Sequence, residues 1–124
     1  MASGQATITP AGPGIFVTAA ADPSQPGAAL NQDSSYNDQG HSATRGSVLQ
    51  IFATGYGPLD PSGQAAVQVY FDETPAEVIF SGPIPQFPGL WQINARVPPN
   101  VSGQVPVYLI AQSLASNGVT VWVQ

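Results

Sequence analysis

The chain has 124 residues, of which 43% are hydrophobic and only 7% are charged, and its formal net charge is −5. A typical soluble domain has about 25% charged residues, whereas this chain has no lysine and only two basic residues, Arg45 and Arg96. Because nucleic-acid binding requires several cationic side chains, the composition excludes nucleic acid as a partner, together with lysine Schiff-base chemistry. With no cysteine and the single histidine His41, it also excludes disulfides, thiolate nucleophiles and Cys/His-rich zinc sites.

Short β-type runs separated by glycine and proline follow one another along the whole chain. In chain order, the predicted strands are residues 5–9, 15–18, 28–32, 47–53, 66–71, 76–80, 90–97, 104–111 and 118–124. Two of the predicted connections are long, residues 33–44 and 81–89. The three prolines at 75, 98 and 106 are expected at edges, strand starts or bulges, because each lacks a donor for the β-ladder.

The spacing of these runs predicts an all-β sandwich of seven to nine short strands. Every stretch of ten or more residues with a helical period contains a glycine or a proline. No apolar run approaches the roughly 18 residues of a membrane span, so no membrane insertion is expected. With so few charged residues to guard its strand edges, the sandwich is expected to be weakly protected against edge-to-edge pairing.

The last two predicted strands form a hairpin with a loop over residues 112–118. The expected pairs are Ala111 with Val119, Leu109 with Val121 and Val107 with Val123, all with buried side chains. Tyr108, Ile110 and Trp122 then form an apolar group on the opposite face. Either a loop or the other end of the chain covers this group, or it is an interface with another domain or subunit.

Six short motifs and the last strand carry a resemblance to a known family. They are Pro13-Gly14-Ile15-Phe16, Ala29-Leu30-Asn31-Gln32-Asp33, Arg45-Gly46-Ser47-Val48, Ala53-Thr54-Gly55-Tyr56-Gly57, Gly89-Leu90-Trp91-Gln92-Ile93-Asn94, Val97-Pro98 and the closing residues 118–124. In order and spacing they resemble an uncharacterised C-terminal domain family of large secreted acidobacterial proteins. The later half is also similar to the IPT/TIG branch of immunoglobulin-like domains. The resemblance implies an immunoglobulin-like sandwich in an exported protein and implies no activity.

The chain divides into an N-terminal strand or linker, residues 1–12, and the sandwich, residues 13–124. Residues 5–9 resemble the closing strand of a preceding domain, and Ile8 would fill a groove if this strand completed the sheet of a neighbouring subunit. Met1 is followed by neither a basic region nor an apolar core, so no signal peptide is expected. A cytosolic protein and a mature or excised piece of a secreted protein both fit, and the lysine-free composition favours secretion to the outside or the surface of a cell.

The densest group of oxygen ligands lies between residues 31 and 39. Asp33, Ser35 and Asn37 alternate as in the first half of a calcium loop. The glycine and glutamate of such a loop are replaced by Asp38 and Thr44. An Asx turn is therefore favoured over a calcium site, and no cofactor is expected.

The candidate catalytic groups do not form a recognisable set. Asp60, Asp72, Glu73 and Glu77 are interpreted as solvated turn charges, and not as the paired carboxylates of a glycosidase. His41 lies in the most polar loop, and the chain has no Gly-x-Ser-x-Gly elbow. The chain is not expected to be an enzyme.

Aromatic rings beside loops leave a carbohydrate site as one alternative. Tyr36 and Tyr56 are the candidate stacking residues. Phe87 and Trp91 also lie near loops, but Trp91 alternates with Ile93 and is expected in the core.

Three functional hypotheses follow from these observations. The first is a non-catalytic structural, adhesion or interaction module whose partners are neighbouring domains or identical subunits. The second is a filament subunit joined by its N-terminal strand, and the third is a carbohydrate-binding module that recognises a surface glycan.

Overall fold

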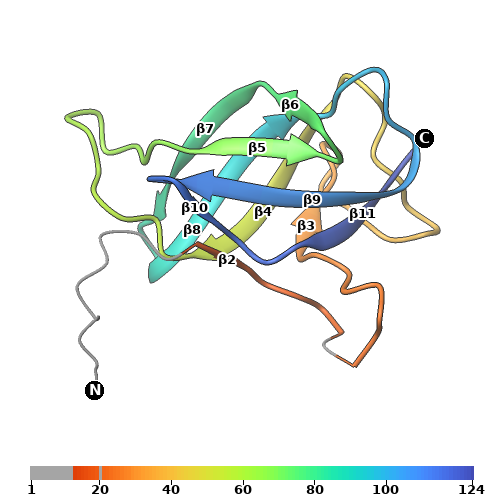
Figure 1. Cartoon of the computed structure of the whole chain (residues 1–124), viewed down its shortest axis with the longest axis horizontal. Helices are drawn as coiled ribbons and strands as arrows, with labels where there is room; N and C mark the ends of the chain where they lie inside the picture. The colour runs from red at the N-terminus through yellow and green to blue at the C-terminus, as the bar shows by residue number, and fades with distance from the viewer. Residues whose placement is uncertain (1–12, 20) are drawn as a thin grey trace.

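The computed structural model describes residues 13–19 and 21–124 as two antiparallel sheets packed face to face. The first sheet contains β2 (Gly14–Ile15), β3 (Ala29–Leu30), β4 (Val48–Thr54), β8 (Phe87–Arg96) and β7 (Val78–Ile84). The second contains β6 (Thr74–Ala76), β5 (Gln68–Phe71), β9 (Gly103–Ala111), β10 (Leu114–Ala115) and β11 (Val119–Val123). In Figure 1, β5 and β9 lie in the front layer and β4, β8 and β7 in the layer behind. The prediction of an all-β sandwich is confirmed. The predicted strand 5–9 and Ile8 lie outside the described residues.

The strand order is that of an immunoglobulin-like domain. Both β2 and β3 pair with β4, and both β10 and β11 pair with β9, so the ten described strands occupy eight positions. The first sheet then has the order A-B-E-D, and the second has the order C′-C-F-G. No helix in the described part of the chain is long and apolar enough to cross a membrane.

Alternating apolar side chains from both sheets form the core. The inward-facing residues of the longer strands are Leu49, Ile51, Ala53, Val69, Phe71, Trp91, Ile93, Ala95, Val105, Val107, Leu109, Ala111, Val119, Val121 and Val123. This period-two pattern is what the sequence predicts for strands with one face on the core.

Trp91 is the largest fully buried side chain. Its indole N–H donates a hydrogen bond of 2.8 Å to Oγ of Ser81, which is also buried. The ring of Tyr56 packs edge-on against Trp91, with 6.4 Å between ring centroids. The predicted core position of Trp91 is confirmed, and its polar atom is satisfied inside the core by a neighbouring strand.

The prediction of a long connection at residues 81–89 is wrong. Strand β7 continues to Ile84 and β8 begins at Phe87, so only Pro85 and Gln86 separate the two strands. The proline and glycine residues of this region sit inside an irregular hairpin, whose register shifts between Pro83 and Ile84. Bulges of this kind accommodate residues that disfavour regular strands.

The expected register of the last hairpin is also wrong. Val119 pairs with Val107, and not with Ala111 four residues further along β9. The chain turns earlier than expected, through Gln112 and Ser113 with positive φ angles of 52° and 67°, and Leu114 pairs with Ala111. Because the shift is even, the buried and outward faces of both strands are those expected.

We expect Ser81→Ala to lower the free energy of unfolding by about 1–3 kcal/mol, because it leaves the buried indole N–H of Trp91 without an acceptor. Chemical denaturation measures the change. Ser102→Ala, at an exposed serine with no hydrogen bond within the described chain, is the matched control and should change stability by less than about 0.5 kcal/mol. Equal stabilities of the two variants would contradict a structural role for this bond.

Candidate functional site

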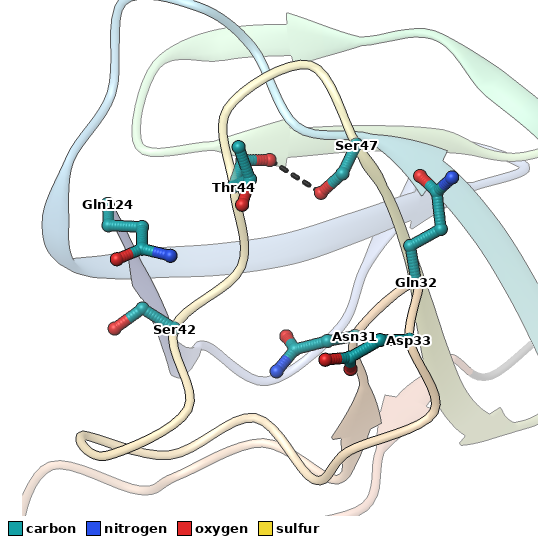
Figure 2. A pocket seen from close by; sticks show the side chains of 7 residues that line it. All are labelled: Asn31, Gln32, Asp33, Ser42, Thr44, Ser47 and Gln124. Carbon is teal, nitrogen blue, oxygen red and sulfur yellow. Dashed lines mark hydrogen bonds between the residues drawn. The ribbon is translucent and has the colours of Figure 1, made fainter.

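A polar hollow of about 440 Å³ lies between the β3–β4 loop and the C-terminal residue. It is lined by Asn31, Gln32, Asp33, Ser42, Thr44, Ser47 and Gln124. In Figure 2, Asn31 and Asp33 lie on one side of the hollow and Ser42 and Gln124 on the other, and Ser47 donates a hydrogen bond to the Thr44 carbonyl. Its volume is in the range of small-ligand sites, and its lining consists of hydroxyls, amides and one carboxylate.

Asn31 holds the wall of this hollow in place. Its side chain is buried, and its Nδ2 donates to Ser35 Oγ at 3.0 Å and to the His41 carbonyl at 2.8 Å. Its Oδ1 accepts a bond of 2.9 Å from Nδ2 of Asn37. One buried amide therefore connects three points of the loop, which gives the hollow a defined shape.

Asn37 connects this loop to the second sheet. Its Oδ1 accepts the backbone N–H of Trp122 at 2.7 Å, and its Nδ2 donates to the Trp122 carbonyl at 2.8 Å. The side-chain amide thus pairs with β11 as a neighbouring strand would. The sequence favours a turn over a calcium site at Asn37 and does not reveal this role, because Trp122 is 85 residues away.

The three calcium candidates are used to build the loop. Asp33 Oδ1 accepts the backbone N–H of Ser35 at 2.9 Å and its hydroxyl at 2.6 Å, while the Asn37 oxygen accepts from Trp122. The expected Asx turn at Asp33 is observed. Within the described part of the chain, no three His, Cys, Asp or Glu residues are grouped so that they could hold a metal ion.

The same turn occurs three times. In each, an aspartate Oδ1 accepts the backbone N–H and the hydroxyl of the serine two residues later; the sequences are Asp22-Pro23-Ser24, Asp33-Ser34-Ser35 and Asp60-Pro61-Ser62. These bonds lower the pKa of all three aspartates below the ordinary value of 3.8. The serine hydroxyl is the larger cause at Asp33 and Asp60, and the serine backbone N–H is the larger cause at Asp22. The repeated Asp-x-Ser pattern is the sequence signal for these turns.

The candidate catalytic residues are scattered over the surface. Nδ1 of His41 lies 3.0 Å from Oδ1 of Asp38, both side chains are exposed, and this bond lowers the pKa of Asp38. Glu77 forms an exposed ion pair of 3.0 Å with Arg96. The other acidic candidates, Asp60, Asp72 and Glu73, are exposed in turns.

The two candidate stacking tyrosines differ in their surroundings. Tyr36 is 76% exposed, and its backbone bridges to Leu30, next to Asn31 in the wall of the hollow. Tyr56 is half-buried against Trp91. Phe87 is exposed on the β7–β8 hairpin. Of the two tyrosines, Tyr36 is therefore the one whose ring is open to solvent.

Tyr108, Ile110 and Trp122 lie on the outer face of the second sheet and are half-buried. The Tyr108 ring stacks on Tyr70 of the neighbouring strand, with 5.2 Å between centroids and 9° between planes. Trp122 pairs with Gln104, so it does not lie opposite Tyr108 as the expected hairpin register would place it. Cross-strand stacking on Tyr70 thus covers one face of the Tyr108 ring, a contact that the pattern of the last hairpin did not reveal.

Side-chain amides cap the outer edges of two strands, one in each sheet. Asn117 Oδ1 accepts the Ile15 N–H at 2.7 Å, and its Nδ2 donates to the Ile15 carbonyl at 3.0 Å, which closes β2. Asn37 closes β11 in the same way, and backbone bonds from Gly27 and Ala43 extend that closure. At the edge strand β6, Pro75 removes a donor, as expected for this residue.

No family model matches the chain, and no curated protein matches it significantly. Among solved structures, it is similar to part of the γ-CGTase from alkalophilic Bacillus clarkii, with a TM-score of 0.51 and 18% sequence identity. The match covers 82% of this chain but only 13% of that chain. The likeness shows the fold alone. The family resemblance described above therefore stays a prediction.

We expect the carboxyl groups of Asp22, Asp33 and Asp60 to titrate below 3.8 in the folded chain. A lowered folded pKa stabilises the chain above the unfolded value, and this contribution is lost as the pH falls through the folded pKa. Carboxyl carbon NMR titration measures the midpoints. Ser35→Ala should raise the midpoint of Asp33 alone, and Ser62→Ala that of Asp60 alone. Unchanged midpoints in both variants would show that the turns do not hold in solution.

Proposed function

We propose that this chain is a non-catalytic immunoglobulin-like module of a secreted or cell-surface protein, in which it acts as a structural spacer and interaction domain. The observation that supports this role is the separation, within the described residues, of β2 from the last residue of the sandwich. Ile15 is bonded to Asn117, just before β11, while Gln124 follows the other end of β11. At about 3.3 Å per residue, these points are about 23 Å apart. Figure 1 shows β2 and the C-terminus on opposite sides of the sandwich.

Units joined at these two ends would follow one another in a line. The β3–β4 loop is held by the side-chain amides of Asn31 and Asn37 and by an Asp-x-Ser turn. The module therefore keeps its neighbouring domains at a fixed orientation and does not act as a flexible linker. The nearly uncharged, lysine-free composition supports an extracellular location.

We expect size-exclusion chromatography with light scattering to report one chain per particle at all concentrations. A head-to-tail fusion of two copies should show, by small-angle X-ray scattering, a maximum dimension greater by about one sandwich length. Polymers that grow with concentration would contradict the spacer role and favour the filament hypothesis. Deletion of residues 1–10 would then abolish assembly if the N-terminal strand joins the subunits.

Carbohydrate binding at the polar hollow is the second candidate. Ser42, Thr44 and Gln124 line the hollow, and their side-chain polar atoms make no hydrogen bond within the described chain. Such groups suit the hydroxyls of a sugar, and the exposed Tyr36 ring lies on the same loop. The γ-CGTase likeness adds only that a sandwich of this fold occurs within a larger enzyme chain.

A glycan array tests this candidate. If the hollow binds sugars, Gln124→Ala and Ser42→Ala should each weaken binding by about tenfold, the effect of losing about 1.4 kcal/mol of hydrogen bonding. Gln86→Ala, at an exposed residue on the β7–β8 turn, is the matched control and should bind like the wild type. A blank array, or equal binding by all variants, would eliminate the hollow as a sugar site.

A further inference from the structure

Asn117 lies in an Asn-Gly sequence, which is prone to loss of the side-chain amide, and this same amide forms two hydrogen bonds that hold β2. It is the only one of five asparagines that is followed by glycine. It lies between β10 and β11, and its amide forms both hydrogen bonds that close β2 at Ile15. We propose that Asn117 is a site of spontaneous deamidation, and that its conversion releases β2 from the sandwich.

The reaction needs only this chain and water. The backbone nitrogen of Gly118 forms a bond to Cγ of Asn117, the Cγ–Nδ2 bond breaks, and the amide nitrogen leaves as ammonia with the proton from Gly118. Water then opens the five-membered imide to aspartate or isoaspartate. Both residues are exposed to water. Gly118 has no side chain to hinder the attack.

The folded structure controls this reaction through β2. The amide is held at 2.7 and 3.0 Å from the Ile15 backbone atoms, so Cγ reaches the Gly118 nitrogen only after these bonds open. The rate therefore depends on how often these two bonds open, a local opening of the kind that hydrogen exchange detects. A change that opens these bonds more often therefore accelerates deamidation, and the product, which lacks the amide donor, holds β2 less well.

The product cannot form both of the hydrogen bonds that Asn117 makes with Ile15. An aspartate at 117 still accepts the Ile15 N–H, but it presents a second oxygen, and no donor, to the Ile15 carbonyl. Isoaspartate also lengthens the backbone between β10 and β11. Release of β2 withdraws the buried Ile15 side chain from the core and exposes the edge of β4 that β2 covers at Ala53 and Thr54, while β8 stays paired on the other side.

Peptide mapping by mass spectrometry, during incubation of the full chain at mildly alkaline pH, tests the chemistry. We expect amide-to-acid conversion at Asn117 and at least tenfold less at Asn37, whose amide has the same edge-closing role but is followed by Asp38. Gly118→Ala should slow the conversion about tenfold without unfolding the chain, because a Cβ at this position meets no atom within 4 Å. Equal conversion at Asn117 and Asn37 would overturn the proposal.

Hydrogen exchange tests the consequence. The Phe16 amide donates to the Phe52 carbonyl of β4 at 3.0 Å and reports the detachment of β2. In aged wild-type protein this amide should exchange about tenfold faster, while aged Gly118→Ala should keep its protection. A short peptide of residues 114–120 should also deamidate at least tenfold faster than the folded chain. Conversion without loss of Phe16 protection, or equal rates in the peptide and the protein, would show that the Asn117 amide does not hold β2 and would overturn the proposal. Neither outcome bears on the spacer role, which the fusion experiment tests separately.

Discussion

The closure of the sheet edges by asparagine side chains is the interaction on which this sandwich depends. An edge strand exposes unpaired N–H and C=O groups, which proteins commonly protect with lysine or other charges. This chain has no lysine. At two edges it has instead the side-chain amide of asparagine, which carries the same donor and acceptor as a peptide group. Asn37 pairs with both backbone groups of Trp122, and Asn117 pairs with both groups of Ile15. The sparse charge points to weakly protected edges, and at Ile15, Trp122 and Pro75 amides and a proline stand where other proteins place charges.

Turns in the loops are also stabilised by hydrogen bonds. In each of three turns, a serine hydroxyl and a backbone N–H donate to an aspartate and stabilise its ionised form, so the turns need no cationic partner. Asn31 and Asn37 then fasten the longest loop to the second sheet. The hydrogen bonds of this loop also shape the polar hollow. The hollow is a candidate sugar site because hydroxyl and amide groups in its lining make no hydrogen bond within the described chain.

Particular residues explain which parts of the fold were predictable. Strand β8 was predicted because Trp91, Ile93 and Ala95 alternate with polar residues, and local alternation is sufficient to define a strand with one buried face. The extension of β7 to Ile84 was missed because Pro83 and Gly82 are turn signals in isolation. The expected loop at residues 112–118 includes Gln112 and Ser113, but the two-residue turn was missed because both residues adopt positive φ without being glycine, and tertiary packing has to compensate for that strain.

The sequence by itself therefore determined the all-β class, the inward face of each long strand and the central position of Trp91, because these depend on spacing along the chain. Only the tertiary structure decided the register of the last hairpin, the Tyr70–Tyr108 stack and the roles of the asparagines. Asn37 meets Trp122 across 85 residues, and Asn117 meets Ile15 across 102. Local sequence cannot encode such partners, because an amide side chain has the same donor and acceptor wherever it stands, and only the fold determines which backbone groups it reaches.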